Sequence, residues 1–111
     1  MTTINFIRNK GNEIVEFTAM GHTNYGMEGE DIVCAAASSI IQTAALGILM
    51  VAEVEAEITK DEKKALFALR LPLTLTPAQR RDSNTILNTM YIGLSDLQQN
   101  YSDFIEVTSN K

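Results

Sequence analysis

Apolar and polar residues alternate along two short stretches near the start of the chain, residues 3–9 and 13–20. Alternation of period two is typical of a half-buried β-strand. Residues 9–12, Asn-Lys-Gly-Asn, separate the two stretches and have the composition of a turn. The pattern therefore predicts a β-hairpin. Its apolar face would carry Ile4, Phe6, Val15, Phe17 and Ala19.

A run without charged residues follows, from Ile32 to Ala52. The run is long enough to be considered as a membrane span. However, it is rich in Ala, contains Ser, Gln and Thr, lacks a flanking basic cluster, and has strand patterns on both sides. We therefore expect a buried central helix, with Asp31 as its N-cap, that runs to about Met50.

A second strand pair and a second helix are predicted beyond this run. Residues 53–59 alternate between apolar and mostly acidic side chains, and residues 64–71 alternate again before Pro72. Thr76 and Pro77 then supply N-cap and N1 signals for a helix. The core-facing positions of this helix would be Ile86, Leu87, Met90, Leu94, Leu97 and Tyr101.

A last short strand is predicted over residues 104–108. The order of elements is then ββαββαβ, which is neither a series of parallel βαβ units nor an all-β pattern. We expect an α+β fold, a single domain over residues 1–111, with a mostly antiparallel sheet packed against two helices.

Composition narrows the function classes. The chain has 111 residues, 45% of them hydrophobic, and nine Lys and Arg against fourteen Asp and Glu, for a formal net charge of -5. An acidic chain disfavours direct binding of nucleic acid. One cysteine forms no internal disulfide, and Met1 precedes polar, strand-like sequence rather than a leader. We expect a cytoplasmic protein that does not enter the membrane.

The chain's one histidine and one cysteine fall in the same segment, residues 21–45. His22 follows the second predicted strand, and Cys34 would be the third residue of the helix capped by Asp31. A thiol needs a nearby positive charge or a helix N-terminus to populate its nucleophilic thiolate form. The pattern predicts an activated thiol, with His22 as the general acid that protonates a leaving amine.

Two further residues, Asp31 and Ser38, and the backbone of Cys34 itself belong to this candidate site. The backbone N–H of Cys34 would be one of the unpaired first-turn donors and so part of an oxyanion hole. Asp31 has three open roles: it caps the helix, orients His22 as a third triad member, or opposes the thiolate by its charge. We favour a dyad with Asp31 structural. Ser38 lies one turn after Cys34, where packing is favoured over a hydrogen bond near the thiol.

The segment between His22 and the helix shows no periodicity. Gly26 and Gly29 bracket a loop that we expect to fold over the site or to move as a lid. Tyr25 and Met27 would contact substrate or cover the core. This predicted mobile substrate loop comprises Thr23, Asn24, Tyr25, Gly26, Met27, Glu28, Gly29 and Glu30.

The competing interpretation of Cys34 and His22 is an inert buried thiol beside an incidental loop histidine, which is the commoner situation for a lone cysteine. A metal site is less favoured still. One Cys and one His would leave two ligands to come from carboxylates without recognisable spacing, and no metal or other cofactor is expected.

A family resemblance changes this weighting. The residues that carry it are Gly21, His22, Tyr25, Gly26, Gly29, the run Asp31-Ile-Val-Cys-Ala-Ala36, and Ser38. They resemble the signature of the ribosomal-processing cysteine protease family, Prp, and the similarity covers essentially the whole chain. The resemblance implies a cysteine endopeptidase with Cys34 as nucleophile and His22 as its base and acid partner, supported by Gly21 and Asp31.

The resemblance also implies a substrate and a partner. Family members remove a short N-terminal extension from the large-subunit ribosomal protein number twenty-seven and cleave after aromatic residues. The resemblance also implies a homodimer. An apolar groove beside Cys34 is therefore expected, with residues 23–30 shifting to admit the peptide. Two alternatives remain: a non-catalytic ribosome-assembly or interaction protein that binds the same tail, and a thiol redox sensor.

Overall fold

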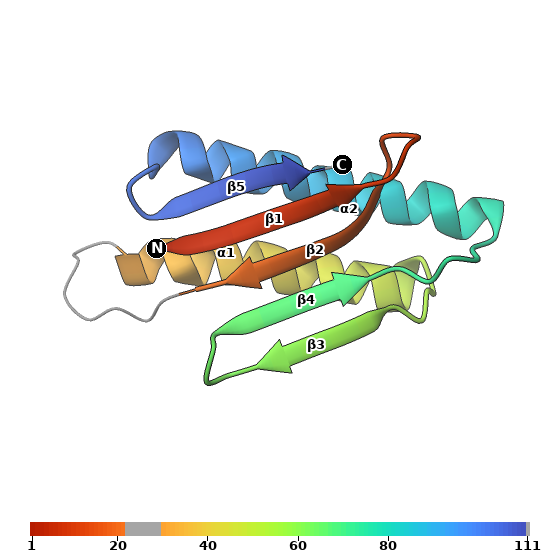
Figure 1. Ribbon diagram of the computed structural model, residues 1–111, viewed down its shortest axis with the longest axis horizontal. Coiled ribbons are helices and arrows are strands. Elements are labelled where there is room, and N and C mark those ends of the chain that lie inside the picture. The colour runs from red at the N-terminus through yellow and green to blue at the C-terminus, as the bar shows by residue number, and fades with distance from the viewer. Residues whose placement is uncertain (22–29, 111) are drawn as a thin grey trace.

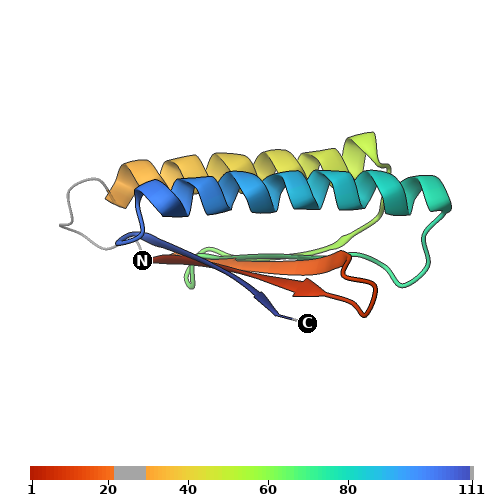
Figure 2. The same ribbon diagram turned by 90° about the horizontal axis from the view of Figure 1, so that it is seen from above.

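Two helices cover one face of a five-stranded sheet (Figures 1 and 2). The computed structural model describes residues 1–21 and 30–110, apart from the side chain of Glu30. The elements in these ranges are β1 (Thr2–Arg8), β2 (Ile14–Met20), α1 (Glu30–Leu46), η1 (Gly47–Val51), β3 (Glu57–Asp61), β4 (Leu66–Arg70), α2 (Pro77–Asn100) and β5 (Ile105–Asn110). The predicted α+β class and order of elements are confirmed, with η1 as a π-helical extension of α1.

The strand order in the sheet is β3-β4-β2-β1-β5. The β1–β2, β2–β4 and β3–β4 pairs are antiparallel, whereas β5 lies parallel to β1 at the edge of the sheet. The prediction of a mostly antiparallel sheet is therefore confirmed. Because β5 runs parallel to β1, the chain must cross over the sheet before it, and α2 makes that crossover (Figure 1).

The first hairpin contains a register shift between Ile7 and Arg8. Ile7 pairs with Glu16 and Arg8 with Ile14, so Val15 is the extra residue of a β-bulge. The bulge turns Ile14 into the core, where it is fully buried, and leaves Val15 partly exposed. The predicted placement of Val15 on the apolar face is wrong for this reason.

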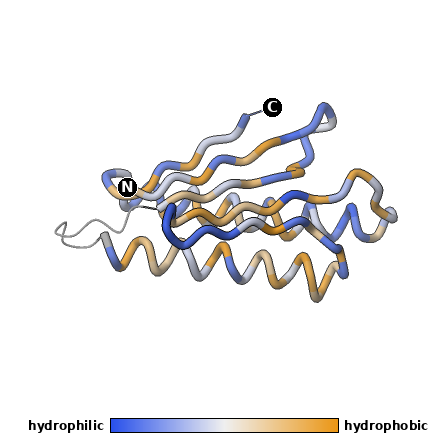
Figure 3. The backbone as a smooth tube through the Cα atoms, turned by 60° about the horizontal axis from the view of Figure 1, so that its bottom comes forward, coloured by the Kyte–Doolittle hydropathy of each residue, from blue (hydrophilic) through white to orange (hydrophobic). Residues whose placement is uncertain are grey.

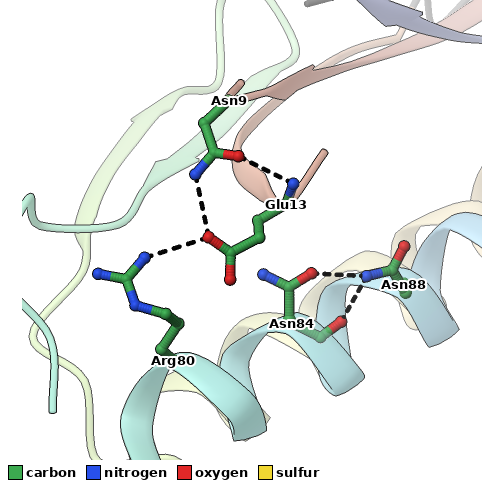
Figure 4. A network of polar contacts seen from close by, with 5 residues as sticks. All are labelled: Asn9, Glu13, Arg80, Asn84 and Asn88. Carbon is green, nitrogen blue, oxygen red and sulfur yellow. Dashed lines mark hydrogen bonds and ion pairs between the residues drawn. The ribbon is translucent and has the colours of Figure 1, made fainter. Parts of the chain in front are cut away.

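Polar contacts fasten the turn of this hairpin to the start of α2 (Figure 4). Asn9 donates from Nδ2 to Oε1 of Glu13 at 3.1 Å, and its own Oδ1 accepts the backbone N–H of Glu13 at 2.9 Å. Nη1 of Arg80 lies 3.2 Å from the same Oε1 atom. The hairpin and α2, far apart in sequence, are therefore joined through one carboxylate.

The uncharged run forms the predicted helix, but this helix is buried on its inner side only, since Ile32 is 72% exposed and Met50 and Val51 are each 73% exposed. Its inner side belongs to the same core cluster as the sheet, and apolar residues run along α1 and η1 (Figure 3). The span Asp31–Val51 is also apolar and long enough to cross a membrane by length and composition, a test that core helices pass as well. The buried residues of its inner side are Val33, Ala37, Ile41, Ala44, Ala45 and Ile48.

The segment after η1 departs from the prediction. Residues 53–56 are not a strand, because Glu53 has a φ of 56° and turns the chain. The Val54 N–H instead donates to the Ile48 carbonyl at 3.0 Å, and the Val54 side chain is only 1% exposed. Val54 is therefore buried because the chain after η1 turns back into the core, and not because it forms a strand. The strand begins at Glu57.

The second helix begins as predicted. Thr76 caps it and forms a capping box with Gln79, and Pro77 is its first residue. Leu87, Met90 and Leu94 are buried, and Ile86 and Leu97 pack against the core. Tyr101 is the exception, since it follows the helix as its C-cap and is 45% exposed. The ring of Tyr101 matches the spacing of the apolar positions along α2, which led to its prediction as a core residue, but the helix ends at Asn100.

Candidate active site

Cys34 lies on the second turn of α1. This helix starts at the end of the sheet where β1 starts and β2 ends (Figures 1 and 2). The Cys34 side chain is partly exposed and forms no disulfide. The Sγ atom is 3.0 Å from Oγ1 of Thr2, the first residue of β1. The helix and the first strand therefore meet at the thiol.

The helix begins two residues earlier than expected, at Glu30 rather than at Ile32. Asp31 is thus the second residue of the helix rather than its N-cap, and Cys34 is the fifth residue rather than the third. An N–H at the fifth position faces the carbonyl four residues back, here that of Glu30. The prediction that the Cys34 N–H is an unpaired oxyanion donor is therefore wrong. The unpaired donors of this helix end no later than Ile32.

The predicted partner His22 and the loop residues 23–29 lie outside the described residues. Gly21, which immediately precedes His22, is described. Its N–H donates to the Ala65 carbonyl at 3.0 Å, and a Cβ atom placed on it would stand 3.5 Å from Oγ1 of Thr2. Gly21 therefore lies beside the Thr2–Cys34 contact, and the position of the imidazole stays a prediction.

The two other site candidates on α1 lie differently. Asp31 is exposed at the start of the helix, and its relation to His22 stays a prediction. Ser38 is exposed one turn beyond Cys34, and its Oγ accepts a hydrogen bond from Nε2 of Gln42 at 2.8 Å. That bond runs along the helix surface. Ser38 therefore has a partner that is not the thiol.

A cleft of about 240 Å³ opens beside Cys34, between α1 and the β3–β4 hairpin. Its walls are mostly apolar, and Lys60 and Glu62 are its charged residues. The expected apolar groove beside the cysteine is thus present. The residues that line it are Thr2, Ala19, Gly21, Cys34, Ala37, Ser38, Ile41, Gln42, Lys60, Glu62, Ala65, Leu66 and Phe67.

The sequence interpretation missed Thr2 and the whole β3–β4 wall of the cleft. The wall comes from strands that approach α1 only in the folded chain, so no local pattern signals it. The sequence does contain a signal for Thr2. It shares the apolar face of β1 with Ile4 and Phe6, and a hydroxyl group buried at such a position requires a hydrogen-bond partner. In the described ranges no group of three His, Cys, Asp or Glu side chains could hold a metal ion.

A partly exposed thiol near a helix start, at the edge of an apolar cleft, is an arrangement that a thiol hydrolase requires. The sequence model of the cysteine protease Prp family matches residues 1–106. The chain belongs to this family, and it is a cysteine peptidase.

Known relatives resemble the chain over nearly its whole length. It is 28% identical over 108 residues to the ribosomal processing cysteine protease Prp of Bacillus subtilis strain 168, covering 97% of this chain and 95% of that protein. Crystal structures of the Staphylococcus aureus Prp share its fold. The complex with a substrate peptide has a TM-score of 0.86 at 23% identity, covering 98% of this chain and 99% of that one. The complex with a covalently linked product peptide has a TM-score of 0.82 at 24% identity, with the same coverage.

Proposed function

We propose that this protein removes the N-terminal extension of the large-subunit ribosomal protein number twenty-seven in the cytoplasm during ribosome maturation. The observation that carries the proposal is the apolar cleft at the Cys34 thiol, in a chain of the Prp family. The ribosomal processing for which the Bacillus relative is named supports the biological setting. The motif resemblance supports the choice of substrate.

Cys34 is the nucleophile in this proposal and His22 its partner. His22 accepts the thiol proton, and the thiolate forms a bond to the scissile carbonyl carbon. The carbon–nitrogen bond then breaks as His22 returns the proton to the leaving amine. Water next cleaves the thioester, with His22 as base, and restores the thiol. The sequence supports this pairing, because His22 directly follows Gly21, and Gly21 lines the cleft at Cys34.

The cleft is the proposed subsite for the residue before the scissile bond. Phe67, Leu66 and Ile41 supply apolar surface for a large side chain. Asp31 has a structural role beside this dyad, and Gly21 supports the site as the cleft residue that directly precedes His22. The shift of residues 23–30 on substrate entry stays a prediction.

The test compares the parent protein with Cys34→Ala and His22→Ala on a peptide that copies the tail of the ribosomal substrate. We expect cleavage by the parent after an aromatic residue, and loss of turnover by several orders of magnitude in both variants. Ser102→Ala is the control, since Ser102 is exposed and lies outside the cleft. Equal turnover by the parent and Cys34→Ala would remove Cys34 from the mechanism.

Two other results would favour the alternatives. Intact peptide that nevertheless binds the parent would indicate a non-catalytic interaction protein. Oxidation of Cys34 by peroxide without any peptidase activity would indicate a redox sensor.

The proposed partner of the helical layer is a second copy of this chain. A groove of about 540 Å³ runs between α1, η1 and α2, and none of its lining residues is charged. Met50 and Val51, each 73% exposed, extend this apolar surface. A surface of this kind is typical of homodimer interfaces.

Analytical sedimentation tests this interface. We expect the parent to sediment as a dimer and Thr89→Arg, which places a charge in the groove, to sediment as a monomer. Thr59→Arg, on β3, is the control and should remain a dimer, and a monomeric parent would contradict the proposed dimer.

A further inference from the structure

The contact between Thr2 and Cys34 joins residues 32 positions apart, and their Oγ1 and Sγ atoms lie 3.0 Å from each other. Thr2 is 6% exposed, and only one other polar residue, Ser83, is buried among the described residues. A buried hydroxyl is costly unless it finds a hydrogen-bond partner. The Thr2 hydroxyl therefore has as its partner the sulfur that the reaction uses, in a contact in which either atom can be the donor.

The backbone around Thr2 holds this hydroxyl in place. The Thr2 N–H donates to the Phe104 carbonyl at 2.9 Å, and Thr2 pairs with Ile105 of β5. On the other side, Gly21 offers space, since a Cβ there would stand 3.5 Å from Oγ1. The position of Thr2 in β1 and its stiff β-branched side chain together limit where the Thr2 hydroxyl points.

We propose that Thr2 is a positioning residue for the Cys34 nucleophile, a role that rests on the proposed function. Its hydroxyl fixes the sulfur at the mouth of the cleft and donates a hydrogen bond to the thiolate before attack. In the neutral enzyme the thiol donates to Oγ1 instead, since a hydroxyl both donates and accepts.

The bond is strongest at one stage of the reaction. A hydrogen bond to an anion is about twice as strong as one between neutral groups. Once the sulfur forms the thioester it has lost its negative charge and is a weak acceptor. The Thr2 hydroxyl therefore favours the thiolate of the free enzyme over the neutral thiol, and its loss lowers the amount of thiolate at neutral pH.

The test must keep the ionisable groups near the contact unchanged. Lys60 and Glu62 line the cleft, and Met1 and Asp31 lie close in sequence to Thr2 and Cys34, respectively. The position of His22 lies outside the described residues. Thr2→Val changes none of these charges, so a changed titration in that variant reports the hydroxyl.

The experiment measures the rate of Cys34 alkylation by iodoacetamide as a function of pH. Thr2→Val keeps the shape of the side chain and suits a β-strand. We expect alkylation at neutral pH to slow about tenfold in Thr2→Val, the effect of losing one hydrogen bond to a charged group. The rates of variant and parent should converge at alkaline pH, where every thiol is ionised.

Two variants separate the hydroxyl from the fold. Thr2→Ser retains the donor and should restore most of the neutral-pH rate. Thr3→Val makes the same change at an exposed position on the opposite face of β1 and should leave the profile unchanged. Thr2→Ala provides a second measurement should Thr2→Val not fold. Identical pH profiles for the parent and a folded variant without the hydroxyl would overturn the proposal.

Peptide cleavage distinguishes this inference from the proposed function. Thr2→Val should lower kcat/KM at neutral pH with a recovery at alkaline pH. A parent that cleaves no peptide, together with an altered alkylation profile in Thr2→Val, would refute the proposed function and leave the thiolate contact in place. A cleaving parent with an unaltered Thr2→Val profile would refute the contact alone.

Discussion

Phe67 stacks on Phe17, with ring centroids 6.1 Å apart and ring planes 20° from parallel. Phe17 is fully buried in the core, whereas Phe67 is partly exposed and lines the cleft at Cys34. The ring at the cleft wall therefore rests on the ring at the centre of the fold. This support holds the wall in one orientation and limits the shape of side chain that the cleft accepts.

Phe67→Leu tests the cleft as a substrate subsite. Removing the ring should lower kcat/KM for a peptide with an aromatic residue before the scissile bond by about tenfold, because loss of apolar contact in a pocket costs about 1–3 kcal/mol of discrimination. Peptide cleavage under substrate-limiting conditions measures this change.

Alkylation by iodoacetamide provides the internal control for this variant. The reagent is small and needs no subsite, so its rate at Cys34 should match that of the parent. Leu73→Ala, at a residue 99% exposed and outside the cleft, should leave both measurements unchanged. A Phe67→Leu protein that cleaves the peptide as fast as the parent would show that the cleft does not bind that side chain.

The carboxylate of Glu13 should titrate at unusually low pH. The hydrogen bond from Asn9 is the largest cause of its lowered pKa, burial opposes the shift, and the hydrogen bond and charge of Arg80 add to it. NMR titration of the Glu13 carboxyl group should therefore give a midpoint below the ordinary pKa of 4.5. Asn9→Ala and Arg80→Ala should each raise that midpoint.

The stability that follows from this pair has a definite sign. The folded-state pKa of Glu13 is lowered, so its contribution is present above the unfolded-state value and is lost as the pH falls through the folded value. The difference in unfolding free energy between the parent and Asn9→Ala should hence shrink on acidification. Asn100→Ala, at the far end of α2, serves as control, and a difference that grows in acid would contradict the linkage.

Much of the fold could be predicted from periodicity, and the misses share one cause. Side-chain patterns do not report where the backbone turns. Val15 alternates with its neighbours in sequence, but the bulge moves Ile14 into the core instead. Val54 alternates with acidic residues, yet the positive φ of Glu53 folds it back on Ile48. Such events depend on the local path of the backbone, which the alternation of side chains does not record.

The site was predictable where chemistry is local. Cys34 near a helix start is visible in the sequence, as is the glycine next to His22. The apolar wall around Phe67 was not, because β4 reaches the cleft only by pairing with β2. Thr2 was missed although its hydroxyl lies on an apolar face. Attention to polar residues at core-facing positions would have found it.

Ser83 is the other polar residue in the described core, and its Oγ atom is buried without a hydrogen-bond partner among the described residues. Ser83→Ala should raise the free energy of unfolding by about 1 kcal/mol, because it removes a buried unpaired hydroxyl and improves helix propensity within α2. Urea denaturation measures this change. Ser95→Ala, at a partly exposed site on the same helix, should show the smaller gain from propensity alone. A destabilised Ser83→Ala protein would mean that the hydroxyl contributes to packing or bonding that outweighs its desolvation.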